Sequence, residues 1–300
     1  MKAIVQCVPN ISEGRNKEIV EMVVNQVRDT EDVKLLDWSM DSDHNRSVIS
    51  FVGTPDGVEK AAFLVCQKAA ELIDMTTHSG EHPRMGATDV VPFIPIQGID
   101  MDACVEIANR VGKRIGDELG IPVYLYEEAA RVPGRKNLAK VRKGQYEGLA
   151  ERMAGEDHKP DYGPHSFNAK CGATAVGARM PLVAFNVNLN TNDLDIANQI
   201  ARNVRNASGG LKAVKAMGVR LEERGIVQVS MNMVNYQQTP LYRAVELIRA
   251  EARRWGVSVI GTEVIGLVPL EALVGSLEYY MGIEDFKMKQ ILETNLWGDE

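Results

Sequence analysis

The strongest constraint on the fold is an order of strand-like and helix-like segments that occurs twice along the 300 residues. In the first half, Ile19, Val20 and Val23 recur at helical spacing, which predicts an amphipathic helix. Short β-branched runs on either side of it predict strands. The expected order is a strand at 3–8, a helix at 16–27, strands at 33–37 and 47–52, a helix at 56–73 and a strand at 90–95.

The second half repeats this order. We expect strands and helices at 182–189, 194–204, 214–221, 226–234, 241–255 and 257–264. A β-α-β-β-α-β order is typical of the split βαβ or ferredoxin-like arrangement. We therefore predict an α+β chain of two ferredoxin-like α/β subdomains, each with a mixed or antiparallel sheet and helices on one face. The Gly-rich stretch 172–177 and Pro181 place the boundary, giving subdomains 1–179 and 180–300.

Composition excludes several classes of protein. The chain is 45% hydrophobic and 25% charged, values that are ordinary for a globular protein. Its net charge of −7 argues against a nucleic-acid-binding protein, because such domains are normally basic. The four cysteines form no C-x-x-C pair, as expected for free thiols in a reducing compartment. No apolar run is long enough to span a membrane, so we expect a cytoplasmic protein with neither nucleic-acid nor membrane partners.

Amide side chains alternate with apolar ones in two of the predicted strands. Asn186, Asn188 and Asn190 alternate with Phe, Val and Leu, and Gln228 and Asn232 alternate with Val and Met in a later strand. Because successive side chains of a strand point to opposite faces, one face of this sheet is apolar and the other carries amides. A solvated sheet face is one interpretation. A polar groove that faces a ligand or the other subdomain is the interpretation we favour.

The segment from His78 to Asp89 gathers most of the reactive side chains. It contains H-x-x-E-H, which on a helix would be a zinc-hydrolase motif. Gly80 interrupts the motif and Pro83 follows His82, and a residue before proline avoids the helical conformation. We therefore predict a loop and no metal site. A loop that holds His82, Glu81, Arg84 and Asp89 is a candidate catalytic segment.

Three other clusters stand out. The segment 9–15 carries Asn10 and Arg15 at the start of a predicted helix, where backbone N–H groups attract carboxylates; a plain helix cap is the alternative. The segment 41–46 precedes a strand and is either a functional cluster or a polar turn. The segment 131–143 contains six basic residues and no acidic one, so it is either a solvated basic surface or an attractor for a polyanionic ligand.

Taken together, these segments resemble the formiminotransferase family, the glutamate formimidoyltransferases. The resemblance covers nearly the whole chain and is most specific in G-E-H-P-R-M-G-A. The chain is similar to the stand-alone form of the family, which lacks the cyclodeaminase domain of the vertebrate enzymes. The matching blocks are 8–15, 45–46, 51–53, 80–87, 89–95, 122–126, 172–174, 177–179, 184–189 and 266–270.

The resemblance implies a dimer of two-subdomain chains that binds tetrahydrofolate between the subdomains, with His82 as the catalytic acid and base. It also implies a folate-binding stretch from Gly163 to Gly172. An acid that assists His82 is implied near Trp38, where this chain offers Asp37, Asp41 or Asp43. The residues of the folate stretch are Gly163, Pro164, His165, Ser166, Phe167, Asn168, Ala169, Lys170, Cys171 and Gly172.

The implied reaction moves a formimino group from N-formiminoglutamate to N5 of tetrahydrofolate. A histidine suits the two proton transfers because its pKa lies near neutrality. Substrate carboxylates favour arginine partners. Two alternatives stay open: a formyl-transferring relative, and a non-catalytic ferredoxin-like binding module. The predicted substrate-binding residues are Arg84, Arg46, Arg15, Asn10, Asn186 and Asn188.

Overall fold

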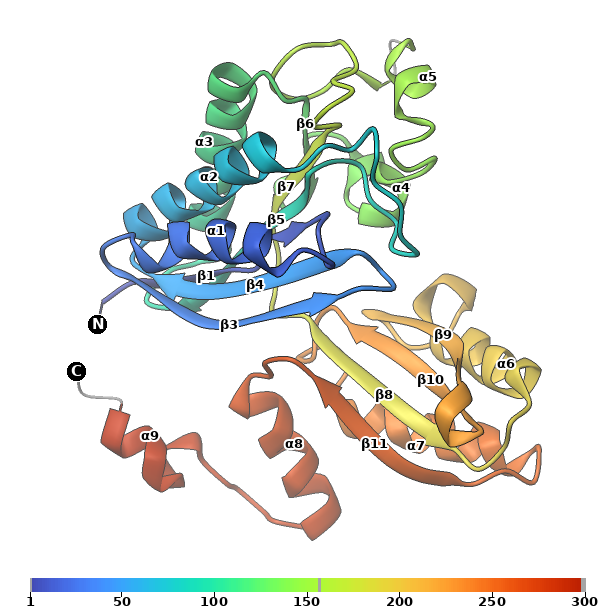
Figure 1. The fold of residues 1–300 in the computed structure, drawn as a ribbon. Helices are drawn as coiled ribbons and strands as arrows, with labels where there is room; N and C mark the ends of the chain where they lie inside the picture. Colours follow the sequence, from blue (N-terminus) through green and yellow to red (C-terminus); the bar gives the residue numbers. More distant parts are fainter. Residues whose placement is uncertain (1, 156–157, 298–300) are drawn as a thin grey trace. The chain divides into compact units, whose positions relative to one another are not determined.

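The computed structural model describes residues 2–155 and 158–297. It divides into two compact units, Met1–Arg179 and Met180–Glu300, and each is described by itself. Both units combine a sheet with helices, and the sheets are a mixed seven-stranded one and an antiparallel four-stranded one. The predicted α+β class is confirmed (Figure 1).

The first unit begins with the predicted order. Its first strand is interrupted at Val8–Pro9 and forms two short strands, since proline has no N–H for the ladder. The strands β1, β2, β4 and β5 pair antiparallel, and β3 pairs only with β4. The elements are β1 (Ile4–Cys7), β2 (Asn10–Ile11), α1 (Lys17–Arg28), β3 (Val33–Asp41), β4 (Arg46–Gly53), α2 (Pro55–Leu72) and β5 (Thr88–Gln97).

The same sheet continues with parallel strands that the predicted order does not include. Helix α3 (Met101–Leu119) connects β5 to β6 (Val123–Glu127), and β7 (Thr174–Ala178) lies between β5 and β6, parallel to both. The buried face of α3 carries Cys104, Ile107 and Val111 at helical spacing. A connecting helix is the usual way to join parallel strands.

Helices cover both faces of the first sheet. The core on one face joins α1, α2 and α3 to inward side chains such as Phe51 and Val91. On the other face, a smaller cluster joins α4 (Leu138–Val141) and α5 (Leu149–Met153) to Val90 and Tyr126. The prediction of helices on one face therefore omits α4 and α5, whose short runs give too little periodicity to be recognised.

The second unit has the strand order β11-β8-β10-β9, with all neighbours antiparallel. This is the split βαβ topology that the sequence predicts. Apolar side chains of β8 and β10 pack against α6 and α7. The elements are β8 (Val183–Leu189), α6 (Leu194–Val204), β9 (Val214–Leu221), β10 (Ile226–Met233), α7 (Leu241–Arg253), β11 (Val259–Ile265), α8 (Leu270–Met281) and α9 (Leu292–Trp297).

No helix in the described parts of the chain is long and apolar enough to cross a membrane.

Candidate active site

The segment 73–87, between α2 and β5, is an irregular loop, as predicted from Gly80 and Pro83. Its main chain is held by the turn that precedes β4. The Glu81 N–H donates to the Asp43 carbonyl at 3.2 Å, and the Asn45 side chain donates to the Ser79 carbonyl at 2.9 Å. A Cβ at Gly80 would lie 2.4 Å from the His44 carbonyl oxygen, so this close approach requires glycine.

The first motif segment joins the same loop from the other side. The Ser12 hydroxyl donates to the Gly86 carbonyl at 2.8 Å, and the Ser12 N–H donates to Ala87. The Gly14 N–H donates to the Asn45 side chain at 2.9 Å. Three segments that are distant in the sequence therefore meet at one end of the first sheet: 9–15, 41–46 and 78–89.

His82 lies in this junction beside Arg46, Asp89 and Arg142, which we call the His82 network. The Arg46 Nη1 atom is 3.3 Å from His82 Nδ1 and 3.5 Å from Nε2. The same guanidinium nitrogen thus lies close to both ring nitrogens of His82. The Asp89 carboxylate is 3.8 Å from His82 Nε2, which is an ion-pair distance rather than a direct hydrogen bond.

Asp89 is the buried anion of this network, with 1% of its side chain exposed. One carboxylate oxygen accepts the Met85 N–H at 2.9 Å, and the other pairs with the Arg142 guanidinium. Burial alone raises the pKa of Asp89, but the charge of Arg142 and the proximity of His82 bring the pKa below its ordinary value. The carboxylate is therefore ionised at neutral pH.

The pKa of His82 is lowered from its ordinary value. Burial is the largest cause, and the positive charges of Arg46 and Arg142 act in the same direction. The carboxylate of Asp89 opposes them. A neutral imidazole at neutral pH can accept a proton, and a nearby carboxylate then stabilises the imidazolium that forms.

Both arginines of the His82 network keep a donor without a partner. The Nε–H groups of Arg46 and Arg142 are buried, and neither has an acceptor among the described residues. The pKa of Arg46 is lowered by burial, but a guanidinium stays charged at any physiological pH. Buried donors without acceptors are rare in folded proteins.

A second group of residues surrounds the other histidine of the loop, and we call His78, Arg84 and Glu147 the His78 network. The Arg84 guanidinium makes a two-pronged ion pair with Glu147 at 2.6 and 2.9 Å. Its Nε–H donates to His78 Nδ1 at 3.1 Å, and Nη2 also donates to the His78 carbonyl. Every nitrogen of Arg84 thus has a protein acceptor, whereas the sequence predicts that Arg84 binds a substrate carboxylate.

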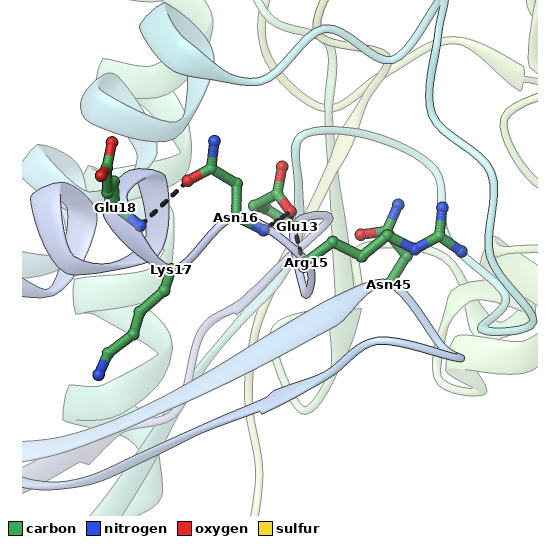
Figure 2. Close-up of a pocket in the computed structure, with 6 residues that line it drawn as sticks. All are labelled: Glu13, Arg15, Asn16, Lys17, Glu18 and Asn45. Atoms are coloured by element: carbon green, nitrogen blue, oxygen red, sulfur yellow. Dashed lines mark hydrogen bonds between the residues drawn. The ribbon is translucent and has the colours of Figure 1, made fainter.

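Arg15 and Asn10 have hydrogen-bond partners other than His82. Arg15 is exposed and donates to the Ser42 carbonyl at 2.9 Å. It lines an open hollow of about 600 Å³ at the start of α1, where the Glu13 carboxylate accepts the backbone N–H groups of Arg15 and Asn16 (Figure 2). Asn10 lies in β2, and its amide donates to the Val8 carbonyl at 3.2 Å.

The three candidate acids differ in their connection to His82. Asp37 is exposed in β3, and Asp43 contributes only a main-chain carbonyl to the loop. The Asp41 carboxylate pairs with His44 at 2.7 Å, and the His44 ring meets the His82 ring edge-on, 6.3 Å between centroids. Partial burial raises the pKa of Asp41, but hydrogen bonds from His44 lower it overall.

Two of the amides predicted to bind a ligand are buried. Asn186 and Asn188 in β8, and Gln228 opposite Asn188 in β10, are each 6% exposed. Asn190 and Asn232, at the ends of the same rows, are exposed. The centre of this face is thus not open to solvent. A role in a groove for ligand stays a prediction.

Comparison with known proteins identifies the family. The family model for the formiminotransferase domain, N-terminal subdomain, matches residues 4–179, and the model for the formiminotransferase domain matches residues 184–295. The chain belongs to the formiminotransferase family. These two matches correspond closely to the two units of the structure.

Relatives in the formiminotransferase family match this chain over nearly its whole length. A glutamate formimidoyltransferase of Streptococcus pyogenes is 55% identical, covering 99% of this chain and 100% of that protein. One of Thermoplasma acidophilum is 48% identical, covering 98% and 97%. The rat formimidoyltransferase-cyclodeaminase is 43% identical over 93% of this chain, which spans 53% of that longer protein.

The predicted folate stretch is attached to the His82 loop at one end. The Ala87 N–H donates to the Cys171 carbonyl at 2.9 Å, and the Ala173 N–H donates to the Met85 carbonyl at 3.1 Å. Within the stretch, residues 163–166 and 169–170 are exposed. Phe167 packs against Tyr146, with ring centroids 5.5 Å apart. Binding of folate by this stretch stays a prediction.

Arg142 and Glu147 belong to these two networks but are not among the site residues predicted from the sequence. Arg142 belongs to the basic run 131–143, which the structure separates into residues with different partners. Arg135 pairs with Asp161, while Arg142 pairs with Asp89. The three lysines of the run are exposed. A basic residue in a mostly exposed run gives no local signal that its side chain is turned inward.

Proposed function

We propose that this chain transfers the formimino group of N-formimino-L-glutamate to N5 of tetrahydrofolate, giving 5-formiminotetrahydrofolate and L-glutamate. Membership of the formiminotransferase family and the full-length similarity to glutamate formimidoyltransferases support this function. The observation that carries it is a half-buried His82 with a lowered pKa, flanked by one carboxylate and two guanidinium groups.

The reaction needs one group that moves protons in both directions. N5 of the folate attacks the formimino carbon and loses a proton as the new C–N bond forms. The bond from that carbon to the glutamate nitrogen then breaks, and the nitrogen gains a proton. Neutral His82 takes the first proton and its imidazolium gives the second, a contribution worth about 10² to 10⁴ in rate.

Asp89 is the positioning residue for this cycle. Its carboxylate is fixed by Met85 and Arg142 and lies 3.8 Å from His82 Nε2. A fixed anion at that distance stabilises the imidazolium without taking its proton, because its own pKa is held low. We assign a weaker, indirect influence to Asp41, which pairs with His44 and whose charge also acts on Arg46.

The substrates impose two further requirements. Arg46, beside the imidazole, is the predicted substrate arginine best placed for a carboxylate of the donor. Because Arg84 is occupied by Glu147, we assign Arg84 to holding the loop. Tetrahydrofolate is the acceptor, and the exposed part of 163–172 is our proposed contact for it. Asn186 and Asn188 are proposed as further ligand contacts, and a homodimer in the cytoplasm as the working state.

The test is a parallel assay of the purified protein with N-formimino-L-glutamate and N-formyl-L-glutamate, each with tetrahydrofolate. Release of glutamate and formation of the substituted folate are measured together. We expect turnover with the formimino donor and at least tenfold less with the formyl donor. Faster turnover with the formyl donor would replace this proposal by the formyl-transferring alternative. Binding of either donor without turnover would favour the non-catalytic alternative.

A further inference from the structure

The hydrogen bonding of Arg46 and Arg142 is incomplete in the same way, and both arginines belong to the His82 network. Each has a buried Nε–H without an acceptor among the described residues, and both influence the same imidazole. Arg46 faces the His82 ring and Arg142 pairs with Asp89. Two unused donors on guanidinium groups beside one histidine are suited to a ligand with two acceptor oxygens.

The charges at this point leave Arg46 without a directly bound anion. Arg46 and Arg142 contribute two positive charges, and Asp89 contributes one buried negative charge. His82 is neutral at neutral pH. The charges of Asp41 and Asp89 both act on Arg46, but Asp41 is 43% exposed and directs its carboxylate to His44, and Asp89 pairs with Arg142. Neither carboxylate is hydrogen-bonded to Arg46 among the described residues, so a ligand anion would give this guanidinium a direct partner.

The chemistry of the donor decides which anion this is. In a formiminoglutamate the nitrogen that leaves is bonded to Cα, and Cα also carries the α-carboxylate. The γ-carboxylate is separated from Cα by two methylene groups. Whatever residue protonates the leaving nitrogen therefore has the α-carboxylate beside it. We infer that Arg46 and Arg142 together bind the α-carboxylate of the glutamyl donor, an inference that rests on the proposed function.

The other arginines near the loop do not compete for this role. Arg84 has protein acceptors on all of its nitrogens. Arg15 is exposed at the hollow beside α1 and donates to Ser42. The γ-carboxylate must find a different partner, and its recognition is independent of Arg46 and Arg142.

The experiment compares three donors: the N-formimino derivatives of glutamate, isoglutamine and glutamine. Isoglutamine replaces the α-carboxylate by an amide, and glutamine replaces the γ-carboxylate. For the unaltered protein we expect the α-amide to lower kcat/KM on the order of a hundredfold, since two charged hydrogen bonds are lost. If the unaltered protein has the same kcat/KM for the glutamate and isoglutamine donors, the inference is wrong.

Variants then assign the effect to the two arginines. Arg142→Lys keeps a cation for Asp89 but removes the Nε–H, and Arg46→Gln removes the other charge. We expect each variant to lower the preference for glutamate over the α-amide at least tenfold and to leave the preference over the γ-amide unchanged. Because each preference is a ratio within one variant, a general loss of turnover cancels.

Arg114→Gln is the matched control, because Arg114 lies on α3 and pairs with the exposed Glu118. It should keep all three ratios. If Arg46→Gln and Arg142→Lys also keep the full preference over the α-amide, the inference is wrong while the proposed function stands. If the unaltered protein transfers from none of the three donors, both fail. Titration of each variant with L-glutamate and isoglutamine gives the same comparison without turnover.

Discussion

The loop between α2 and β5 presents two histidines in contrasting surroundings. In the His78 network, Arg84 is 5% exposed and all of its nitrogens donate to protein acceptors. In the His82 network, Arg46 and Arg142 each keep an unused buried donor. The same residue types, a few positions apart, thus form one complete and one incomplete set of hydrogen bonds.

The contrast distinguishes a network that stabilises the fold from one that can bind a substrate. A complete network rigidifies the chain and has nothing left to offer a ligand. An incomplete one costs stability, and its unused donors are available to a substrate. We therefore expect changes in the His82 network to alter turnover and its pH dependence, whether or not they also cost stability. Changes in the His78 network should alter stability and leave the pH dependence of turnover in place.

The largest effect on turnover is expected from His82→Ala. It should lower kcat at least a hundredfold, the low end for loss of general acid–base catalysis, with little change in the melting temperature because His82 lies in a loop. Steady-state kinetics and melting curves on single variants of all five histidines provide the measurement. Near-normal turnover in a folded His82→Ala protein would contradict the distinction between the two networks. An equally large loss of turnover in His78→Ala would contradict it as well.

Asp89→Asn should change both stability and pH dependence. It leaves Arg142 without its buried partner, at a cost of about 3 kcal/mol in the free energy of unfolding. Activity requires neutral His82 and therefore falls as the pH drops through its pKa. Because Asp89 raises that pKa, its loss should shift the acidic limb of kcat/KM to lower pH.

Arg46→Gln is the counterpart of Asp89→Asn in the same pH profile. The charge of Arg46 lowers the pKa of His82, so its removal should shift the acidic limb to higher pH. Profiles recorded between pH 5 and 8 test the pair. Shifts in the same direction would show that the limb does not report His82.

Arg84→Gln is expected to act on stability. The side chain loses its ion pair with Glu147 and its hydrogen bonds to His78, which we expect to cost about 2 kcal/mol, the value of a charged hydrogen bond. Chemical denaturation measures the loss. The sequence alone predicts a raised KM for the glutamyl donor instead, and a raised KM without lost stability would return Arg84 to the substrate site.

The smallest effect is expected from Glu147→Gln. Glu147 is 63% exposed, and ion pairs with an exposed partner contribute at most about 1 kcal/mol. Hydrogen bonding by Arg84 lowers the pKa of Glu147, so this contribution is present above its unfolded pKa and is lost as the pH falls through the folded one. Denaturation at pH 7 and pH 4 should show a smaller difference for the variant than for the unaltered protein.

The order of elements could be predicted because it depends on local patterns. The helix 194–204 and the strand 214–221 are found at the predicted residues. Proline after His82 and glycine before it fix the loop, which the structure confirms. The strands β6 and β7 are absent from the prediction, because a short apolar run does not distinguish a buried strand from other buried segments.

The sequence by itself determined the alternation of helices and strands, the loop around His82 and, through its motifs, the family. Only the tertiary structure decided which arginine serves which histidine. Arg142 meets Asp89 across 53 positions, Arg84 meets Glu147 across 63, and Arg46 meets His82 across 36. Such pairings are set by how the sheet brings separate segments together, and no periodicity or local propensity records them. An arginine in the sequence is a cation of known chemistry, and its acceptors depend on the fold.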